Sequence, residues 1–363
     1  GGGIYREVLV PDGGQRRNRR EEKRRRDGKR KMAFNICVVG CGSMSSHVHG
    51  PSYREYAARH PEVRLAACCD LDAEKAENYR SAFGFEKAYT DMDLMLDTER
   101  PDAVCLIVPE HLTAKIAVRI LEKGYPLLTE NPPGLTSAET LAMIAAAEKS
   151  GVPTQVAFNR RSMPYAKTLK RLLAERWKPE DIVNIRYDFY RVDRRDADFS
   201  TTAIHGIDAV RFLAGSDYKR IRFEYRQIPG CEAHVVQINM TCEMDSGAHA
   251  YLAFQPVSGV LLERAVVQTA GNTFMLDLPV EHSVDYPGRL VRYEGGSAVE
   301  HRPEDGGRTD LRPFMTGGFY DENASFFDDL RAGRRPVHDL ASGLQSVQIA
   351  EAIRNREAGY EKH

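Results

Sequence analysis

The sequence predicts an α/β protein with two domains: a doubly wound parallel sheet, followed by an α+β domain with a large open, mostly antiparallel sheet. From residue 34 to 159, short apolar runs alternate with helical stretches, as in a parallel sheet covered by helices. The turn Gly40-Cys41-Gly42 directly follows the first of these runs. After about residue 180 the runs lengthen, and several alternate polar and apolar residues, as expected for a sheet with one open face.

The elements of the first domain are expected at its apolar runs and at the helical stretches between them. Each predicted helix is followed by a glycine, which supplies the left-handed residue that ends a helix. Thr136 and Glu139 add a capping-box pattern to the third helix. The expected strands are 35–39, 63–69, 103–108, 126–128 and 154–158, and the expected helices are 72–83, 112–123 and 137–149.

The second domain is expected to contain six strands, and two helices are expected to return to the first domain or to the join. The strands are 183–190, 221–227, 234–241, 248–254, 263–269 and 273–278, and the helices are 320–331 and 341–358. The predicted division is a basic arm over 1–31, a dinucleotide-binding Rossmann domain over 32–160, a substrate and oligomerisation domain over 161–340, and a C-terminal helix over 341–363.

The composition predicts a cytoplasmic globular protein without a membrane or metal partner. The 363 residues are 42% apolar and 28% charged, and no apolar run reaches membrane-spanning length. The seven cysteines are odd in number, lack metal-ligand spacing and lie mostly in apolar stretches, as reduced core thiols do.

Residues 1–31 carry 12 Lys+Arg against 5 Asp+Glu, a net charge of +7, whereas the rest of the chain carries −8. Such an arm is typical of nucleic-acid or anionic-surface binding. The alternative is a tag, a linker or upstream translation ahead of Met32. The many glycines and few apolar residues favour this alternative, so no nucleic-acid partner is predicted.

The glycine turn predicts a nucleotide site. Gly40 allows the tight turn, and Gly42 lets the backbone N–H groups there, including those of Ser43 and Met44, approach a pyrophosphate at a helix N-terminus. Asp70 ends the second apolar run, where its carboxylate can accept hydrogen bonds from the adenosine ribose. The nearby Asp72 would repel a 2′-phosphate, so NAD is favoured over NADP. Alternatively, either aspartate caps the next helix.

The segment from Gly124 to Pro132, which contains Glu130-Asn131-Pro132, resembles the Gly-x-x-x-x-x-Glu-Lys-Pro segment of the Gfo/Idh/MocA (glucose-fructose oxidoreductase and inositol dehydrogenase) family. The family's lysine is Asn131 here, and an amide hydrogen-bonds a hydroxyl but transfers no proton near neutral pH. Val108-Pro109-Glu110 resembles the family's Thr-Pro-Asn. The resemblance implies that Val108, Pro109 and Glu130 lie at the cofactor.

Two further segments carry the resemblance. The segment 159–164, Asn-Arg-Arg-Ser-Met-Pro, is similar to the family's Asn-Arg-Arg-x-x-Pro, although Arg160 and its neighbour could also be solvated arginines at a domain join. The segment with Thr201, His205 and Asp208 resembles an Asp-x-x-x-His-x-x-Asp helix and places the three on one helix face. The resemblance implies substrate binding by Arg160, Tyr165 and Asp208, and catalysis by His205 with Asn131 and Thr201. Alternatively, His205 is a structural helix residue.

The leading hypothesis is an NAD(H)-dependent oxidoreductase that acts on a sugar, sugar acid or cyclitol. Hydride would pass between a carbinol carbon and the nicotinamide, and His205, with an ordinary pKa near 6.5, would take the hydroxyl proton. One alternative is an NAD-dependent, redox-neutral glycosidase, and another is a non-catalytic NAD- or sugar-binding regulator. The resemblance also implies a homodimer or homotetramer.

Overall fold

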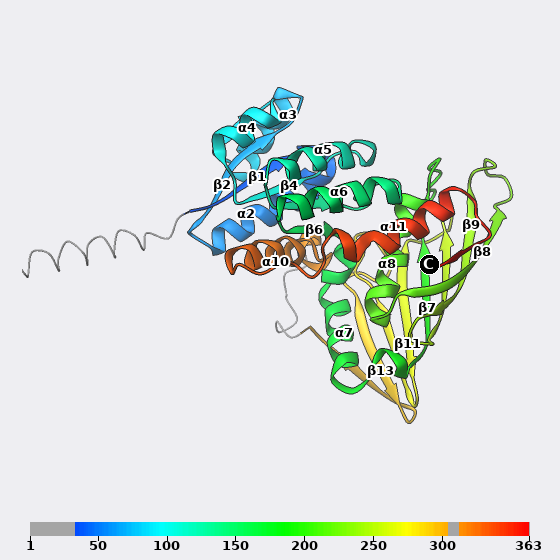
Figure 1. Ribbon diagram of the computed structural model, residues 1–363. Helices are drawn as coiled ribbons and strands as arrows, with labels where there is room; N and C mark the ends of the chain where they lie inside the picture. Colours follow the sequence, from blue (N-terminus) through cyan, green and yellow to red (C-terminus); the bar gives the residue numbers. More distant parts are fainter. Residues whose placement is uncertain (1–32, 304–311, 363) are drawn as a thin grey trace, which may run out of the picture.

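The computed structural model describes residues 33–303 and 312–362, so the predicted basic arm lies outside the described residues. Figure 1 shows the chain as two parts, with the first domain beside a second domain dominated by one large sheet. The first domain contains a six-stranded parallel sheet in the order β3-β2-β1-β4-β5-β6. This is the doubly wound order, and its switch point between β1 and β4 is where such sheets bind ligands. The strands are β1 (Phe34–Val39), β2 (Val63–Cys69), β3 (Lys87–Tyr89), β4 (Ala103–Leu106), β5 (Leu127–Glu130) and β6 (Thr154–Ala157).

Helices cover this sheet, and their ends follow the predicted capping residues. Gly84 and Gly151 adopt positive φ angles of 82° and 69° at the ends of α3 and α6, and the Thr136–Glu139 capping box is present. The helices are η1 (Ser45–His49), α2 (Gly50–Arg59), α3 (Ala73–Phe83), α4 (Met92–Glu99), α5 (Glu110–Glu122) and α6 (Ser137–Ser150).

The second domain is a nine-stranded sheet in the order β14-β13-β12-β11-β7-β10-β9-β8-β15. Its neighbours are antiparallel except β7 and β10, which pair in parallel. The strands are β7 (Ile182–Tyr190), β8 (Tyr218–Gln227), β9 (Val236–Met244), β10 (His249–Gln255), β11 (Leu262–Thr269), β12 (Asn272–Asp277), β13 (Arg289–Glu294), β14 (Ser297–His301) and β15 (Gly359–Glu361).

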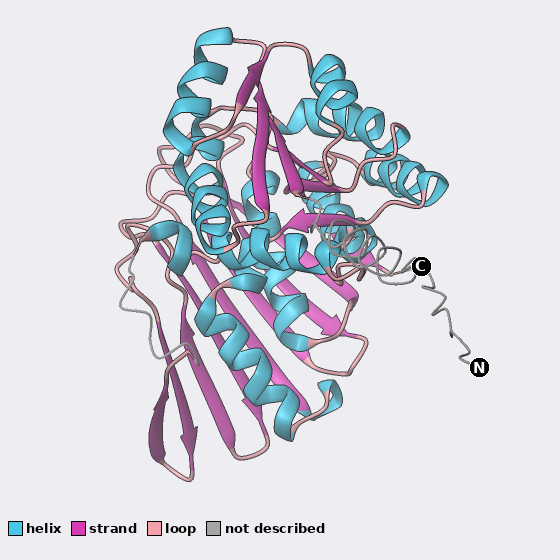
Figure 2. Ribbon diagram, turned by 90° about the vertical axis from the view of Figure 1, so that its left-hand side faces the viewer, coloured by secondary structure: helices cyan, strands magenta, loops and turns pink. Residues whose placement is uncertain are grey.

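Helices cover one face of this sheet, as Figure 2 shows. They are α7 (Pro164–Arg176), α8 (Ser200–Ala214) and α11 (Leu340–Arg354), with the short η2 (Asn159–Ser162) and η3 (Pro179–Asp181) at the ends of α7. Gly206 lets α8 approach closely, because a Cβ there would lie 2.9 Å from the ring of Phe254. The opposite face exposes Val183, Tyr251 and Met275. The alternation predicted for an open sheet is therefore present.

The chain returns to the first domain before residue 340, which differs from the predicted boundaries. After α9 (Pro313–Thr316), helix α10 (Phe319–Arg331) buries Phe326 and Phe327 in the same core as Tyr53 of α2. α11 then contacts both α6 and α8, and β15 joins the edge of the large sheet beside β8. The aromatic face of α10 explains this placement, because the apolar side of α2 offers it a partner.

Six of the seven cysteines are buried thiols and Cys231 is partly exposed. Within the described ranges, no helix is long and apolar enough to cross a membrane. No group of three or more His, Cys, Asp or Glu side chains there is arranged to hold a metal ion.

Candidate functional site

A cleft of about 880 Å³ lies between the two domains. The first domain contributes the glycine turn with Ser43 and Met44, the segment after β4 with Val108 and Pro109, and the end of β5. The second domain contributes residues 191–205, including Thr201 and His205. Thus most of the predicted cofactor and catalytic positions, far apart in sequence, line one cavity.

The glycine turn after β1 has two glycines with different surroundings. Gly40 has φ +100°, and a Cβ there would lie 1.8 Å from the carbonyl oxygen of Ile107. Gly42 lines the cleft, and a Cβ there would meet no protein atom within 4 Å. Gly40 is therefore required by the packing of β1 against the end of β4. The open space at Gly42 is what close approach of a pyrophosphate needs.

Asp70 and Asp72 have separate roles. Asp70 accepts hydrogen bonds from the backbone N–H groups of Cys41 (2.9 Å) and Asp72 (3.0 Å), so its carboxylate lies against the glycine turn. The Asp72 side chain instead accepts from the backbone of Glu74 and Lys75 and caps α3. The capping alternative therefore holds for Asp72. Asp70 stands where a ribose-binding carboxylate is expected at the end of β2.

Asn131 lines the cleft and joins the ends of β5 and β6. Its amide nitrogen donates to the carbonyl of Ala157 at 2.7 Å, and its backbone N–H donates to the Glu130 carboxylate at 3.1 Å. Its Oδ1 is buried without a partner among the described residues. The position that carries lysine in the resembled motif is thus occupied by a side chain that holds two strand ends together.

Glu130 lines the same cleft and is hydrogen-bonded to a buried histidine. One carboxylate oxygen contacts Nε2 of His49, which is fully buried. Nδ1 of His49 contacts the amide nitrogen of Asn323 at 3.1 Å. An amide nitrogen only donates, so the His49 proton lies on Nε2 and is donated to Glu130. His49 thus orients the carboxylate of Glu130 in the cleft.

His205 contacts Arg160 through Nδ1, with Nη1 of Arg160 3.1 Å away. A guanidinium only donates, so Nδ1 is the acceptor and a neutral ring carries its proton on Nε2. Burial, and then the charge of Arg160, lowers the pKa of His205 well below 6.5, so the ring is neutral near pH 7. In this arrangement neither ring nitrogen has a free lone pair. The sequence predicted a proton acceptor, whereas in this arrangement the ring offers an N–H donor to the cleft.

Behind His205 lies a buried charge network that the sequence reasoning missed. Glu263 is fully buried and is bound by Arg160, with Nη2 to Oε1 at 2.6 Å, by Arg191, and by the Tyr187 hydroxyl at 2.8 Å. Burial opposes ionisation of Glu263, but the two guanidinium groups hold its pKa below the usual range. One signal was present in the sequence. Glu263 lies on the same buried face of β11 as Ala265 and Val267, and a carboxylate on a buried face requires a partner.

Two predicted substrate-binding residues lie elsewhere. Asp208 is fully buried and accepts two hydrogen bonds from Arg161, at 2.6 and 2.7 Å, and one from Ser346. Asp208 follows His205 by three residues, and three residues along an α-helix rotate the side-chain direction by about 60°. This rotation is enough to direct Asp208 toward α11. Tyr165 packs against the core of the large sheet, beside Gly288. Neither side chain lines the cleft, so the structure does not bring these two predicted residues to the candidate site.

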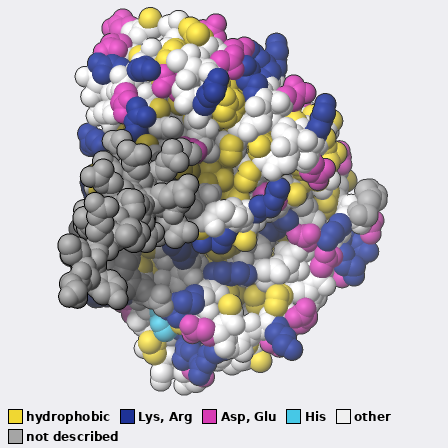
Figure 3. Space-filling model, turned by 60° about the vertical axis from the view of Figure 1, so that its left-hand side comes forward, with side chains coloured by type: hydrophobic (Ala, Val, Ile, Leu, Met, Phe, Trp, Pro, Cys, Tyr) yellow, Lys and Arg dark blue, Asp and Glu magenta, His cyan; other side chains and the backbone are white. Residues whose placement is uncertain are grey.

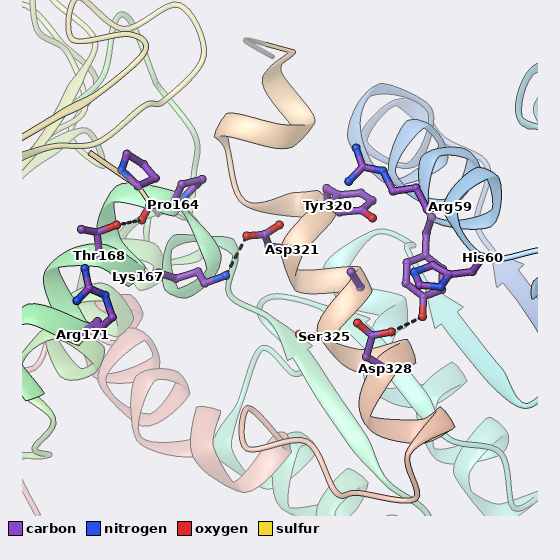
Figure 4. Close-up of a pocket in the computed structure, with 13 residues that line it drawn as sticks. Arg59, His60, Pro164, Lys167, Thr168, Arg171, Tyr320, Asp321, Ser325 and Asp328 are labelled. Atoms are coloured by element: carbon purple, nitrogen blue, oxygen red, sulfur yellow. Dashed lines mark hydrogen bonds and ion pairs between the residues drawn. The ribbon is translucent and has the colours of Figure 1, made fainter. Parts of the chain in front are cut away.

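A second cavity, of about 600 Å³, lies between α2, α7 and α10. Figure 3 shows Lys and Arg side chains gathered across the middle of one face of the molecule. In the close-up of Figure 4, Lys167 points toward Asp321 and pairs with it at 3.0 Å. The hydroxyl of Tyr56 donates to Asp328 at 2.6 Å. Its polar groups thus bind one another. None of the predicted site residues lines this cavity, so the cleft is the candidate site.

Comparisons with known proteins agree with this fold. Residues 34–158 match the Gfo/Idh/MocA family model, described as an oxidoreductase family with an NAD-binding Rossmann fold. Inositol 2-dehydrogenase 2 of Saccharopolyspora erythraea is 26% identical over 335 residues, covering 88% of this chain and 92% of that protein. D-apiose dehydrogenase of Paraburkholderia graminis is 30% identical over 143 residues, only 39% of this chain and 36% of that protein.

A solved structure of levoglucosan dehydrogenase in complex with NADH has the same fold. Its TM-score is 0.73 at 19% identity, and the alignment covers 90% of this chain and 98% of that one. The predicted fold is confirmed by this likeness and by the parallel and antiparallel sheets. The first domain, residues 34–158, thus matches the NAD-binding Rossmann fold of the Gfo/Idh/MocA oxidoreductase family.

Proposed function

We propose that this protein is an NAD(H)-dependent oxidoreductase that acts on a CH–OH group, or the corresponding ketone, of a sugar, sugar acid or cyclitol. The match of the first domain to that oxidoreductase family and the similarity to inositol and apiose dehydrogenases support this proposal. The single observation that carries it is the interdomain cleft. There the glycine turn of the first domain and His205 of the second line one cavity.

The residues of the first domain fit NAD. The open space at Gly42 leaves room for a pyrophosphate beside the backbone of Ser43 and Met44. Asp70 does not line the cleft itself, but its carboxylate lies against the glycine turn, at the end of β2, and there it would accept hydrogen bonds from the ribose hydroxyls. The second carboxylate, Asp72, disfavours a 2′-phosphate, so NADP is the less suited cofactor. Val108, Pro109 and Glu130 line the part of the cleft next to this turn. Bound NAD supplies the hydride acceptor for the reaction.

His205 and Glu130 have different roles at the reacting hydroxyl: His205 donates a hydrogen bond to its oxygen, and Glu130 accepts its proton. The Nε2–H of neutral His205 donates a hydrogen bond to the substrate oxygen and stabilises the negative charge that develops there. Arg160 holds the ring in this tautomer. The hydroxyl proton passes to the Glu130 carboxylate as the carbinol carbon loses hydride, and the reverse steps reduce the ketone. Asn131 orients Glu130, and Thr201 lines the same cleft, where its hydroxyl donates to the backbone of Asp198.

The test is His205→Asn, which removes the ring but keeps a small polar side chain. We expect kcat to fall by roughly 10²- to 10³-fold, the usual effect of losing an oxyanion donor. The affinity for NAD should stay nearly constant because the cofactor residues lie in the first domain. Absorbance of NADH with aldoses, aldonates and cyclitols measures the rate, and fluorescence titration measures binding.

His282→Asn is the matched control, because that side chain is 85% exposed and its φ of 65° is one that asparagine readily adopts. It should behave like the wild type. Glu130→Gln should lower kcat as strongly as His205→Asn. An unchanged rate in either of these two variants would reject the role assigned to it.

A further inference from the structure

The cleft wall beside His205 contains two cations that share one anion. Arg160 and Arg191 both bind Glu263, and the exposed fractions of their side chains are 10% and 8%. Glu263 itself is fully buried. A buried charge is costly unless an opposite charge compensates it. This network therefore carries one positive charge that Glu263 leaves unbalanced.

The other carboxylates around the cleft do not supply the missing charge. Asp196 pairs with Arg194 at 2.8 Å, and Asp198 pairs with Arg354 at 2.5 Å. Glu130 is engaged by His49 and Asn131, as described above, and Glu110 lies on the first domain at the start of α5. The carboxylates that the second domain brings to the cleft, Asp196 and Asp198, are thus both paired. The excess charge thus remains at the substrate end of the cleft.

Of the two arginines, Arg191 is the one that can bind a ligand. Arg160 uses Nε, Nη1 and Nη2 in contacts to Glu263, Asn159 and His205. Arg191 has five N–H groups. Among the described residues its side chain makes two hydrogen bonds, from Nη2 to Glu263 and from Nη1 to the carbonyl of Tyr190. Its remaining donors have no protein acceptor there, and the residue lines the cleft.

The position of Arg191 is fixed, which favours a built site over a mobile surface charge. Its guanidinium stacks on the ring of Phe189, with 3.7 Å between the guanidinium carbon and the ring centroid. Burial lowers the pKa of Arg191; Glu263 opposes this effect and Arg160 adds to it. A ligand anion would relieve both the burial cost and the repulsion between the arginines.

We propose that the substrate is a sugar acid whose carboxylate binds Arg191 while its reacting hydroxyl faces His205. A planar carboxylate matches the paired N–H groups of a guanidinium. The substrate class is thus an aldonate or uronate rather than a neutral cyclitol or aldose. This inference rests on the proposed function, because it assigns the substrate of the same cleft.

The experiment compares Arg191→Gln with the wild type, using gluconate and glucuronate as acids, glucitol and myo-inositol as neutral compounds, and glucose 6-phosphate as a different anion. Calorimetry on the NADH-loaded protein measures binding, and NADH absorbance measures turnover. Wild-type protein should bind an acid more tightly than the neutral compounds. Arg191→Gln should weaken that binding roughly tenfold to hundredfold, the range for charge-assisted hydrogen bonds, and leave neutral compounds unaffected.

The variant is expected to fold, because it leaves Glu263 with one cation, Arg160, and so balances the buried charges. Arg191→Lys should retain part of the affinity for acids. Arg195→Gln is the matched control: Arg195 is on the same segment but pairs with Asp193 and Glu232. Thermal unfolding and NADH affinity of all three variants should match the wild type.

Four results would be decisive. Equal binding of acids and neutral compounds would overturn the inference, and so would an equal effect of Arg191→Gln on the binding of both. In either case, NADH formation from a neutral compound would leave the proposed oxidoreductase function intact. Binding of glucose 6-phosphate alone through Arg191 would also overturn it. Arg191-dependent binding of acids without any NADH formation would support the anion site and reject the oxidoreductase function.

Discussion

At the scale of single residues, the contacts of a side chain decide its chemistry more than its type does. The sequence identifies His205 as a titratable residue at a matched position, and the free imidazole pKa predicts proton transfer. Arg160, 45 residues away, donates to Nδ1 and makes the ring an N–H donor instead. Such a partner depends on how two domains meet, so sequence spacing does not predict it. Asp208 shows the same limit, because its partner Arg161 lies on η2.

Asn131→Lys restores the side chain of the resembled motif and tests whether this position now needs it. We expect a lower kcat, because an ammonium group beside Glu130 would stabilise its ionised form and oppose its uptake of a proton. The variant also loses the hydrogen bond to Ala157. Steady-state NADH formation is the measurement, and Asn131→Ala controls for the lost hydrogen bond. A rate increase of tenfold or more would show that the account of this site is wrong.

At the scale of elements, apolar runs predicted the buried strands well and missed the short or exposed ones. The runs 35–39 and 63–69 correspond to β1 and β2, and the glycines after helices end α3 and α6. β3 is only three residues long, and β14 is exposed at the sheet edge, so neither has an apolar run. α7 was also missed, although its apolar residues share one buried face and its charges lie on the other, which is the pattern of an amphipathic helix.

The turn after β1 gives a matched pair of glycine variants. Gly42→Ala should fold as stably as the wild type but bind NAD more weakly, because its Cβ enters open space in the cleft. Gly40→Ala should lower the free energy of unfolding by roughly 3 kcal/mol, since its Cβ would overlap a backbone oxygen and its φ is positive. Urea unfolding and NADH fluorescence separate the two effects. Equal stability loss in both variants would contradict this division.

At the scale of the whole molecule, the C-terminal segment ties the two domains together. α10 packs on α2, α11 lies between α6 and α8, and β15 extends the large sheet. The sequence predicted that these helices return to the first domain or to the join, but it placed the domain boundary at residue 340. The amphipathic pattern of α10 shows that one face is buried, but it does not show against which element. The homodimer or homotetramer remains a prediction at this scale.

Glu322 of α10 predicts a pH dependence of stability. Both its carboxyl oxygens are buried without a partner in the described part of the chain, and burial, followed by the charge of Glu130, raises its pKa well above 4.5. The folded protein therefore keeps a proton that the unfolded chain releases above about pH 4.3. The stability contribution is full below that pH and falls as the pH rises toward the folded-state pKa.

Glu322→Gln removes this titration while keeping the shape of the side chain. We expect the variant to unfold at a higher temperature than the wild type at pH 8, with little difference near pH 4. Calorimetric scans across this range measure the effect, and Glu224→Gln serves as an exposed control. A difference that is the same at every pH would exclude a buried protonated carboxyl.

The central claim is hydride transfer in the interdomain cleft, and the most direct measurement follows deuterium from a carbon-deuterated aldonate, aldose or cyclitol to the nicotinamide C4 of added NAD. The account predicts that wild-type protein gives deuterated NADH and one equivalent of ketone, and that His205→Asn gives far less of both. NAD bound in the cleft without deuterium transfer from any of these compounds, or sugar released from a glycoside without net NADH, would contradict it.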